Sequence, residues 1–417
     1  MTALLRRPTA PPVADGPAAW SIGAPRLLAG LPASGHLDLA GHLATHGPMP
    51  AAEVDKLLAC LDASGLAGRG GAGFPLATKL RSLPAGGGRE VIVNGTESEP
   101  ASQKDRVLLH RAPHLVLDGA LAVAAALGTR DVTVAVHGEA TAGVLRAAVA
   151  ERPDARRVRV RAVPRGFVSG EARAVVRALR GGPAVPTGRR TPPSTEGVLL
   201  SNVETFAQVA VLLRLGPHRF ADTGTGIEPG TTLLTVGGAV GRPGVVEIPP
   251  GTPLGIVLAA AQAAEPHAVV IGGYHGAWHA PVPALRLSRE GVRSAGGTLG
   301  AGVLLVVDRD TCALGELARV ATWLAGESAH QCGPCHFGLP ALAADVAAAA
   351  AGWSGAPGAA FGHARSIDGR GACAHPDGAA RFVTSGLHLL HDESDRHERH
   401  GTCGYPVLGR LPIGGGR

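Results

Sequence analysis

The stretch SGLAGRGGAGFPLATK, Ser64 to Lys79, decides how this chain is interpreted, because five of the nine residues from Gly65 to Gly73 are glycine. Glycine has no Cβ, so it accepts positive φ angles and lets backbone N–H groups turn inward around an anion. Arg69 and Lys79 can add positive charge. The stretch therefore predicts a phosphate cradle. A flexible linker is the plainer alternative, but the apolar periodicity on both sides disfavours it.

Polar side chains follow the first predicted strand. Val91 to Val93 is a short apolar run, and the segment VNGTESEPASQKDR continues from its last valine. Asn94, Glu97 and Glu99 lie in this segment, where side chains at the end of a parallel strand meet a bound ligand. They are therefore candidates for ligand contact.

Strands and helices alternate through the first half of the chain. Helical spacing is present at 51–61, 108–127 and 140–150, and strand-like runs at 132–136 and 158–163. Such alternation predicts a parallel sheet with ligand loops at the strand ends. The pattern changes after Thr232, where short strands at 233–236 and 244–248, a helix at 252–261 and a last strand at 303–307 indicate a second unit. Tyr274 and His275 lie in a glycine-rich loop of this unit and are predicted to be exposed.

Composition limits the function classes. The chain has 417 residues, of which 45% are hydrophobic, which is enough for two to four folded domains. The formal charge of +6 is spread along the chain, and no Lys/Arg cluster is interleaved with aromatic residues, so nucleic acid is not an expected partner. Neither a signal peptide nor a long apolar run is apparent. We expect a cytoplasmic protein that meets a membrane only through partners.

Six cysteines in such a chain favour metal ligation or simple burial over disulfides. Cys60 lies on an apolar helical face and is predicted to be a core residue. Cys332 and Cys335 form a C-x-x-C in GESAHQCGPCHFG, after a helical segment at 308–325. Thiolates at that spacing suit zinc or an iron–sulfur cluster, and no thioredoxin-like context precedes them. The later HDESDRHERH, residues 391–400, is interpreted as a solvated charged helix end and not as a metal site.

The glycine loop and VNGTESEPASQKDR together resemble the flavin-binding (51 kDa, F-type) NADH-oxidising subunit of respiratory complex I and its relatives in NAD-dependent hydrogenases and formate dehydrogenases. The likeness runs over about residues 60 to 390. It implies an α/β plus α+β fold. The implied parts are an N-terminal extension (1–50), a Rossmann-like FMN-binding α/β domain (51–220), a ubiquitin-like β-grasp (SLBB-type) module (221–307), a helical bundle carrying an iron–sulfur cluster (308–395) and a C-terminal tail (396–417).

The resemblance also implies a set of cofactor contacts. Glu97 would place the nicotinamide or its ribose. The implied FMN contacts are Gly68, Arg69, Gly70, Gly71, Gly73, Lys79, Asn94, Glu99, Phe167, Gly170, Glu171, Asn202 and Thr205. From chemistry alone, Asn202 and Thr205 at the start of a helix are equally well explained as ordinary caps.

For the metal, the resemblance implies a [4Fe–4S] cluster held by Cys332, Cys335 and Cys373. These residues fall on the second, third and fourth cysteines of the related pattern, and Ala329 occupies the place of the first. His330 or His336, or else Cys403 or Cys312, can supply a fourth ligand. An iron left open to water, a degenerate cluster or a zinc ion in its place are the alternatives.

Several further positions depart from the related pattern. Thr96 replaces an aspartate beside the flavin, Leu80 an aromatic residue, Ala172 the second of two acidic residues and Ser201 an asparagine. The implied protein is a divergent stand-alone homologue. It would pass electrons from NAD(P)H through FMN to the cluster and on to a ferredoxin-like or quinone-reductase partner. The alternative is a non-enzymatic or degenerate homologue that serves as electron carrier or scaffold without oxidising NADH.

Overall fold

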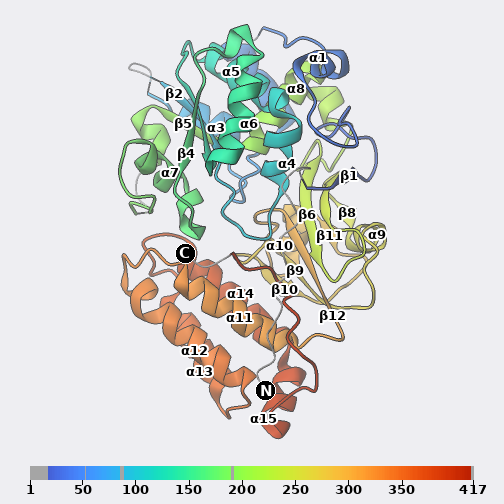
Figure 1. Ribbon diagram of the computed structural model, residues 1–417, viewed down its shortest axis with the longest axis vertical. Helices are drawn as coiled ribbons and strands as arrows, with labels where there is room; N and C mark the ends of the chain where they lie inside the picture. Colours follow the sequence, from blue (N-terminus) through green and yellow to red (C-terminus); the bar gives the residue numbers. More distant parts are fainter. Residues whose placement is uncertain (1–16, 52, 85–88, 189–191, 415–417) are drawn as a thin grey trace.

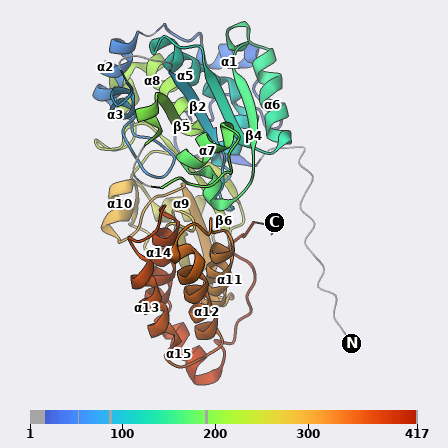
Figure 2. The same ribbon diagram turned by 90° about the vertical axis from the view of Figure 1, so that its left-hand side faces the viewer.

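The computed structural model describes residues 17–51, 53–84, 89–188 and 192–414. An α/β unit lies at one end, a sheet of six strands lies beside and below it, and a group of helices lies at the other end (Figures 1 and 2). The predicted mixed α/β fold with parallel pairing is confirmed.

The α/β unit is built on four parallel strands in the order β4-β3-β2-β5. Their bounds are β2 (Glu90–Gly95), β3 (Val132–His137), β4 (Arg159–Val163) and β5 (Val198–Asn202). The strand order runs one way from β2 through β3 to β4 and the other way to β5. This reversal makes the carboxyl ends of β2 and β5 the expected ligand crevice of the sheet.

Helices cover both faces of this sheet (Figure 1). The helices of this unit are α1 (Leu39–His46), α2 (Val54–Ser64), α3 (Leu76–Arg81), α4 (Lys104–Arg111), α5 (Pro113–Ala126), α6 (Glu139–Ala150), α7 (Ala172–Leu179) and α8 (Val203–Ala221). The single helix predicted at 108–127 is wrong. Two helices meet there at 93°, because Pro113 begins α5 and cannot continue α4.

The six-stranded sheet has the order β1-β7-β6-β12-β9-β10. The strands are β1 (Ala19–Ser21), β6 (Thr232–Gly238), β7 (Gly244–Ile248), β9 (Pro266–Ile271), β10 (Ala277–His279) and β12 (Val303–Asp308), and the unit also holds β8 (Thr252–Pro253), α9 (Leu254–Ala260), β11 (Arg286–Leu287) and α10 (Arg289–Ser294). The sequence predicts that residues 1–50 are an N-terminal extension. Its β1 instead pairs with β7, and the backbone N–H groups of Leu27 and Leu28 donate to Glu247.

The helical part consists of α11 (Ala313–Gly326), a π-helical turn at Pro334–Gly338, α12 (Leu339–Ala350), α13 (Ala356–Ile367), α14 (His375–Leu389) and α15 (His391–His400). One face of the six-stranded sheet packs on α9, and the other packs on α11 and α14 through Val270, Leu305, Leu317 and Phe382. The sheet therefore shares its core with the helices.

The segment after α15 lies against α11. The buried carboxylate of Glu316 accepts hydrogen bonds from the backbone N–H groups of Gly409, Arg410 and Leu411. Tyr274, predicted to be exposed, is buried, and its hydroxyl donates to the Pro412 carbonyl at 2.6 Å. The tail is therefore held to both the helices and the sheet.

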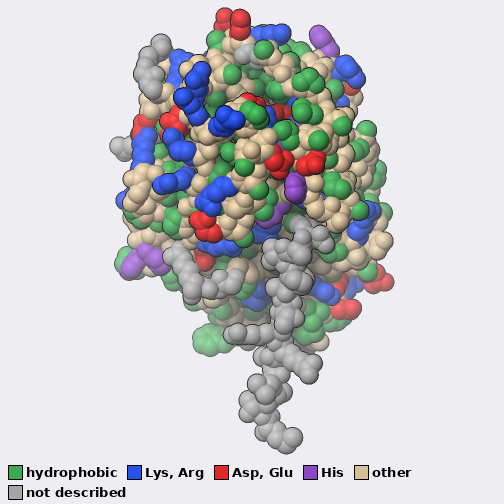
Figure 3. All heavy atoms as spheres, turned by 45° about the horizontal axis from the view of Figure 1, so that its top comes forward, with side chains coloured by type: hydrophobic (Ala, Val, Ile, Leu, Met, Phe, Trp, Pro, Cys, Tyr) green, Lys and Arg blue, Asp and Glu red, His purple; other side chains and the backbone are tan. Residues whose placement is uncertain are grey.

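Among the described residues, no single helix has the length and apolar character needed to cross a membrane; only the sharply bent pair of α4 and α5 passes such a test jointly. On the face that Figure 3 brings forward, Lys and Arg side chains lie among acidic and apolar ones.

Candidate active site

The glycine loop folds over the carboxyl end of β5. Ala67 and Pro75 form a bridge that closes the loop, and the Gly68 N–H donates to the Phe74 carbonyl at 2.9 Å. A Cβ on Gly70 would lie 3.2 Å from the Cβ of Asn202, so the loop approaches the strand end closely. Gly71 and Gly73 have φ angles of 97° and 65°, which side-chain-bearing residues rarely adopt. The glycines thus allow both the turn and the close approach.

A buried charge network lies beneath this loop. Lys104 Nζ lies 2.9 Å from Asp105 Oδ1, 3.0 Å from Glu204 Oε2 and 3.2 Å from Asn202 Oδ1. Asn202 Nδ2 donates to Asp105 Oδ2 at 2.6 Å. Burial alone would lower the pKa of Lys104, but Asp105 and Glu204 outweigh it and hold that pKa above its ordinary value. The network fixes the end of β5 against the start of α4.

Sequence reasoning did not select Lys104, Asp105 or Glu204. The available signal was their place in QKDR, in the loop segment that follows the first strand, and directly after Asn202 at the end of β5. Asn202 is also the cap of α8, since its Oδ1 accepts from the Glu204 N–H at 3.0 Å. The capping role and the network role coexist in one side chain.

Arg69 points into the protein. Its guanidinium donates to the carbonyls of Pro229 and Thr231 and lies 3.8 Å from the Glu204 carboxylate, with the side chain almost fully buried. Its backbone N–H donates to Thr205 Oγ1 at 2.9 Å. Thr205 therefore holds the loop at the start of α8, and Arg69 ties the loop to the segment that leads into β6.

Lys79 has a different environment. Its Nζ donates to the Leu200 carbonyl at 3.1 Å, near the end of β5, and burial lowers its pKa. Among the described residues it has no ion pair with a carboxylate. A partly buried ammonium without a counter-charge at the edge of a glycine cradle fits a phosphate group.

The polar residues after β2 make contacts of their own. Asn94 Nδ2 donates to the Gly170 carbonyl at 3.0 Å, and a Cβ on Gly170 would lie 2.5 Å from Ser98 Oγ. Glu97 accepts from Ser102 Oγ at 2.6 Å and from the N–H groups at the start of α4. Burial is the main cause that raises the pKa of Glu97. Glu97 thus caps α4, as Glu171 caps α7 through the N–H groups of residues 173 and 174.

Glu99 joins the α/β unit to the six-stranded sheet. Its Oε2 accepts from the Tyr274 N–H at 2.8 Å, whereas its buried Oε1 has no hydrogen-bond partner among the described residues. Burial is the main reason that its pKa rises to about 7. The carboxyl group of Glu99 therefore exchanges its proton near neutral pH.

Phe167 lies at the meeting point of the three parts of the molecule. Its ring lies edge-on to His275 and to Trp323, with centroids 4.7 and 5.2 Å away, and 5.4 Å from His375. Its N–H donates to Glu327 at 2.9 Å. His275 Nε2 and His375 Nδ1 are 3.0 Å apart. His275, predicted to be exposed, is partly buried here because it packs against these rings.

The cysteine cluster lies beside this junction. Cys335 is buried, and its thiol has a pKa raised to about 12, first by burial and then by the neighbouring thiols of Cys332 and Cys373. Ala329 lies in the segment before them and carries no ligand atom. Three thiols that face one another suit an iron–sulfur cluster or another thiophilic metal.

The candidate fourth ligands are distributed unevenly. His330 and His336 are exposed beside the cluster, with ring centroids 6.0 Å apart. Cys312 and Cys403 lie together elsewhere, next to α15. The structure therefore keeps the two histidines near the three thiols and gathers the two cysteines at another place.

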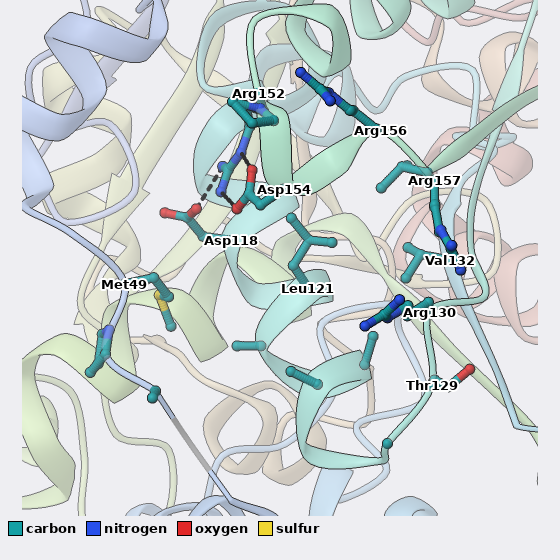
Figure 4. A pocket seen from close by; sticks show the side chains of 18 residues that line it. Met49, Asp118, Leu121, Thr129, Arg130, Val132, Arg152, Asp154, Arg156 and Arg157 are labelled. Carbon is teal, nitrogen blue, oxygen red and sulfur yellow. Dashed lines mark hydrogen bonds and ion pairs between the residues drawn. The ribbon is translucent and has the colours of Figure 1, made fainter.

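A larger cavity of about 740 Å³ opens at the opposite end of the parallel sheet, near the start of β3 (Figure 4). Arg152 lies there between Asp118 and Asp154, at 2.6 and 2.8 Å, and Arg130, Arg156 and Arg157 also line the cavity. The amino ends of parallel strands are not where such sheets bind nucleotides. The crevice under the glycine loop remains the better candidate despite its smaller volume.

Comparison with known proteins gives consistent matches. Residues 61–211 match the Nuo51 FMN-binding domain model, and residues 315–397 match the NADH-ubiquinone oxidoreductase-F iron-sulfur binding region model. The F subunit of the NADH-quinone oxidoreductase of Streptomyces coelicolor is 31% identical over 376 residues, covering 82% of this chain and 83% of the relative. Its counterpart in Mycobacterium bovis is 29% identical over 406 residues, with coverages of 87% and 89%.

Among solved structures, an NAD+-reducing [NiFe]-hydrogenase in its air-oxidized state is similar, with a TM-score of 0.77 and 29% identity. The likeness covers 83% of this chain and 63% of the hydrogenase chain. This chain therefore spans just under two thirds of that hydrogenase chain.

Proposed function

This chain belongs to the family of the F subunit of NADH-quinone oxidoreductase. From that membership we propose which of its residues bind FMN, the nicotinamide and the iron–sulfur cluster. It is an oxidoreductase subunit with an FMN-binding domain and an iron–sulfur binding region, and NADH is the substrate of the family. When bound, FMN supplies hydride acceptance and one-electron release. The protein supplies binding, orientation and electrostatics.

One observation carries the proposal: the glycine cradle leaves Lys79 without a paired carboxylate among the described residues, whereas Arg69 is engaged by Glu204 and two carbonyls. We assign Lys79 and the N–H groups of the loop to the flavin phosphate. The Asn94 side chain donates a hydrogen bond to the Gly170 carbonyl, and we assign these two residues to the wall beside the ribityl chain. Asn202, Thr205 and Glu171 act by holding the cradle and its neighbouring helices.

Glu97 is assigned to the nicotinamide side of the crevice. Its carboxylate already accepts three hydrogen bonds at or just before the start of α4. These bonds fix the loop after β2 in place, and this rigid loop then positions the ligand. Glu99 orients that loop against the second unit through Tyr274.

The finer architecture follows the same logic. The six-stranded sheet with α9 is proposed to be the β-grasp (SLBB-type) module of residues 221–307, completed by β1 from the N-terminal segment. Helices α11 to α15 are proposed to be the iron–sulfur bundle of residues 308–395. The Phe167 junction brings the turn at Phe167–Gly170 against the segment before Cys332, which supports electron transfer between the two cofactor sites.

The proposed electron acceptor is a ferredoxin or another iron–sulfur protein. Cys332 and the two nearby histidines are partly or fully exposed, so a partner can approach this edge. Any membrane association is assigned to such partners.

The test is anaerobic purification of the full chain, followed by quantification of FMN, iron, sulfide and zinc and by absorbance spectra before and after NADH. We expect bound FMN and about four irons per chain, with bleaching of the flavin band by NADH. Cofactors without bleaching would support the alternative of an electron carrier that has lost NADH oxidation. A colourless protein would refute both.

Lys79→Met is the sharpest variant for the cradle. Loss of this ammonium should weaken FMN binding by about 10- to 100-fold, since a charge-assisted hydrogen bond contributes ~1.5–3 kcal/mol. Arg81→Met is the matched control, because Arg81 lies on the same helix but pairs with exposed Asp62. Equal FMN affinity in the two variants would show that Lys79 does not contact the flavin phosphate.

A further inference from the structure

A second cluster of potential metal ligands lies at the other end of α11 from the Cys332 cluster. Cys312, Glu393, His397 and Cys403 each offer one ligand atom, and these atoms all lie within 4.8 Å of one another. Cys312 caps the start of α11, Glu393 and His397 are four residues apart on α15, and Cys403 follows in the tail. The cap of α11, helix α15 and the tail therefore each bring potential ligand atoms to the same place.

The surroundings hold these side chains in place. The Cys312 N–H donates to the Pro406 carbonyl at 2.8 Å, and its Sγ accepts from the Gly315 N–H at 3.2 Å. Glu393 Oε1 accepts from the Leu314 N–H at 3.0 Å. The start of α11 thus directs backbone N–H groups at both the sulfur and the carboxylate.

No Lys or Arg of the described part of the chain forms an ion pair with this cluster. Cys312, Glu393 and His397 are only 3%, 4% and 5% exposed. Among the described residues, Glu393 has no ion pair with Lys or Arg. A buried carboxylate beside two thiols is costly without a cation, and a bound metal ion removes that cost.

His397 is also incompletely satisfied. Its Nε2 lies 3.4 Å from Cys312 Sγ, whereas its buried Nδ1 has no hydrogen-bond partner among the described residues. In a tetrahedral zinc site, ligand atoms about 2.0–2.3 Å from the metal lie roughly 3.3–3.8 Å apart. The distance between Cys312 and His397 already falls in that range.

We propose that Cys312, Glu393, His397 and Cys403 form a structural site for one divalent zinc-like cation. Two thiolates, one imidazole and one carboxylate fill a tetrahedron with no open position, which is typical of structural and not catalytic zinc. Binding releases the two thiol protons to solvent. No oxidant or reductant is needed.

The metal would fasten the tail to the helices. Cys403 comes just before the residues that bond to Glu316 and Tyr274, and the Tyr274 N–H in turn donates to Glu99. Loading this site therefore stabilises the tail and, through Tyr274, the edge of the crevice. The inference does not depend on the proposed function.

The test must separate this site from the thiols of the Cys332 cluster. We would prepare the full chain with Cys332→Ser and Cys335→Ser, so that neither iron nor zinc is held there, and measure zinc by mass spectrometry after dialysis against a weak chelator. About one zinc per chain is expected. Adding Cys403→Ala should abolish it, and adding Cys60→Ala, a half-buried cysteine on α2, should not.

Two further measurements keep the result decisive. Cobalt loaded in place of zinc should give the intense visible bands of a tetrahedral thiolate site, and His397→Gln should weaken them even if Cys403→Ala disturbs folding. Far-UV circular dichroism reports whether each variant is folded. Zinc unaffected by either substitution, or a Cys312–Cys403 disulfide found by peptide mapping without reduction, would overturn the proposal.

Discussion

The two cysteine clusters at the ends of α11 differ in how their residues are brought together. The Cys332 cluster takes two of its three thiols from a single C-x-x-C segment, whereas the Cys312 cluster draws on a helix cap, a helix face and a tail. The helix has 14 residues, so the clusters are separated by roughly 20 Å. Local spacing makes the first cluster visible in the sequence, and only the folded chain assembles the second.

Cys335→Ser should have the largest effect. Removal of this buried thiol leaves only two of the three cysteine thiolates of the cluster, so we expect essentially all of the bound iron to be lost. Zinc at the Cys312 cluster and FMN should remain. Iron, zinc and FMN are quantified in the same sample, and Cys60→Ser is the control. Loss of all three cofactors would mean that the clusters are not independent.

Glu316→Gln probes the tail without touching a ligand. The amide keeps one acceptor oxygen but places a donor opposite one of the N–H groups of residues 409–411, in a site with no exposure. We expect a loss of about 1–3 kcal/mol in stability, measured by thermal unfolding, and faster proteolysis of the tail. Zinc affinity should fall while iron is retained. Arg399→Gln, at an exposed position of α15, is the matched surface change.

Glu99→Gln tests the connection from the tail to the crevice. Because the pKa of Glu99 is raised to about 7, its protonated form is favoured in the folded state. That stabilisation is complete below the ordinary pKa of a glutamate and is lost as the pH rises toward and through about 7, by about 1 kcal/mol between pH 6 and 7. The neutral amide should flatten this part of the stability profile. An unchanged profile in urea unfolding would show that Glu99 does not titrate there.

Ala329→Cys should give the smallest effect and sharpen the comparison further. It supplies the thiol that the related pattern has at this position. If His330 or His336 now serves as the fourth ligand, we expect the cluster to lose iron a few-fold more slowly in air, because a thiolate holds iron–sulfur clusters better than an imidazole. The decay of the visible absorbance measures it. No change would indicate that position 329 does not face the cluster.

The regular parts of the fold were predictable. The strands at 132–136, 158–163 and 244–248 and the parallel pairing followed from apolar runs alternating with helical spacing. Pro113 carried enough information to divide the helix at 108–127, and its position was not used. The glycine loop and the C-x-x-C segment were visible because each depends on neighbouring residues.

The partners and the burial of the charged side chains were not predictable in the same way. Nothing local says that Arg69 faces Glu204 while Lys79 has no carboxylate partner in the described part of the chain, since these contacts depend on where β5 ends and α8 begins. HDESDRHERH was interpreted as a solvated helix end, yet Glu393 and His397 are buried. Their spacing of four residues places them on one face, which was the available signal. Cys312 and Cys403, distant in sequence, complete that face only after folding.

The order of strands in the parallel sheet also has a consequence for synthesis of the chain. Strand β2 can pair with β3, and β3 with β4, as soon as these strands emerge, but the other edge of β2 stays open until β5 follows. That edge belongs to Val91, Ile92 and Val93, an apolar run of the kind that recruits other strands. The unpaired edge of β2 is therefore exposed and prone to aggregation while α6 and α7 are being synthesised. When β5 pairs with β2, it covers this edge. The same step brings Asn202 into place and completes the crevice.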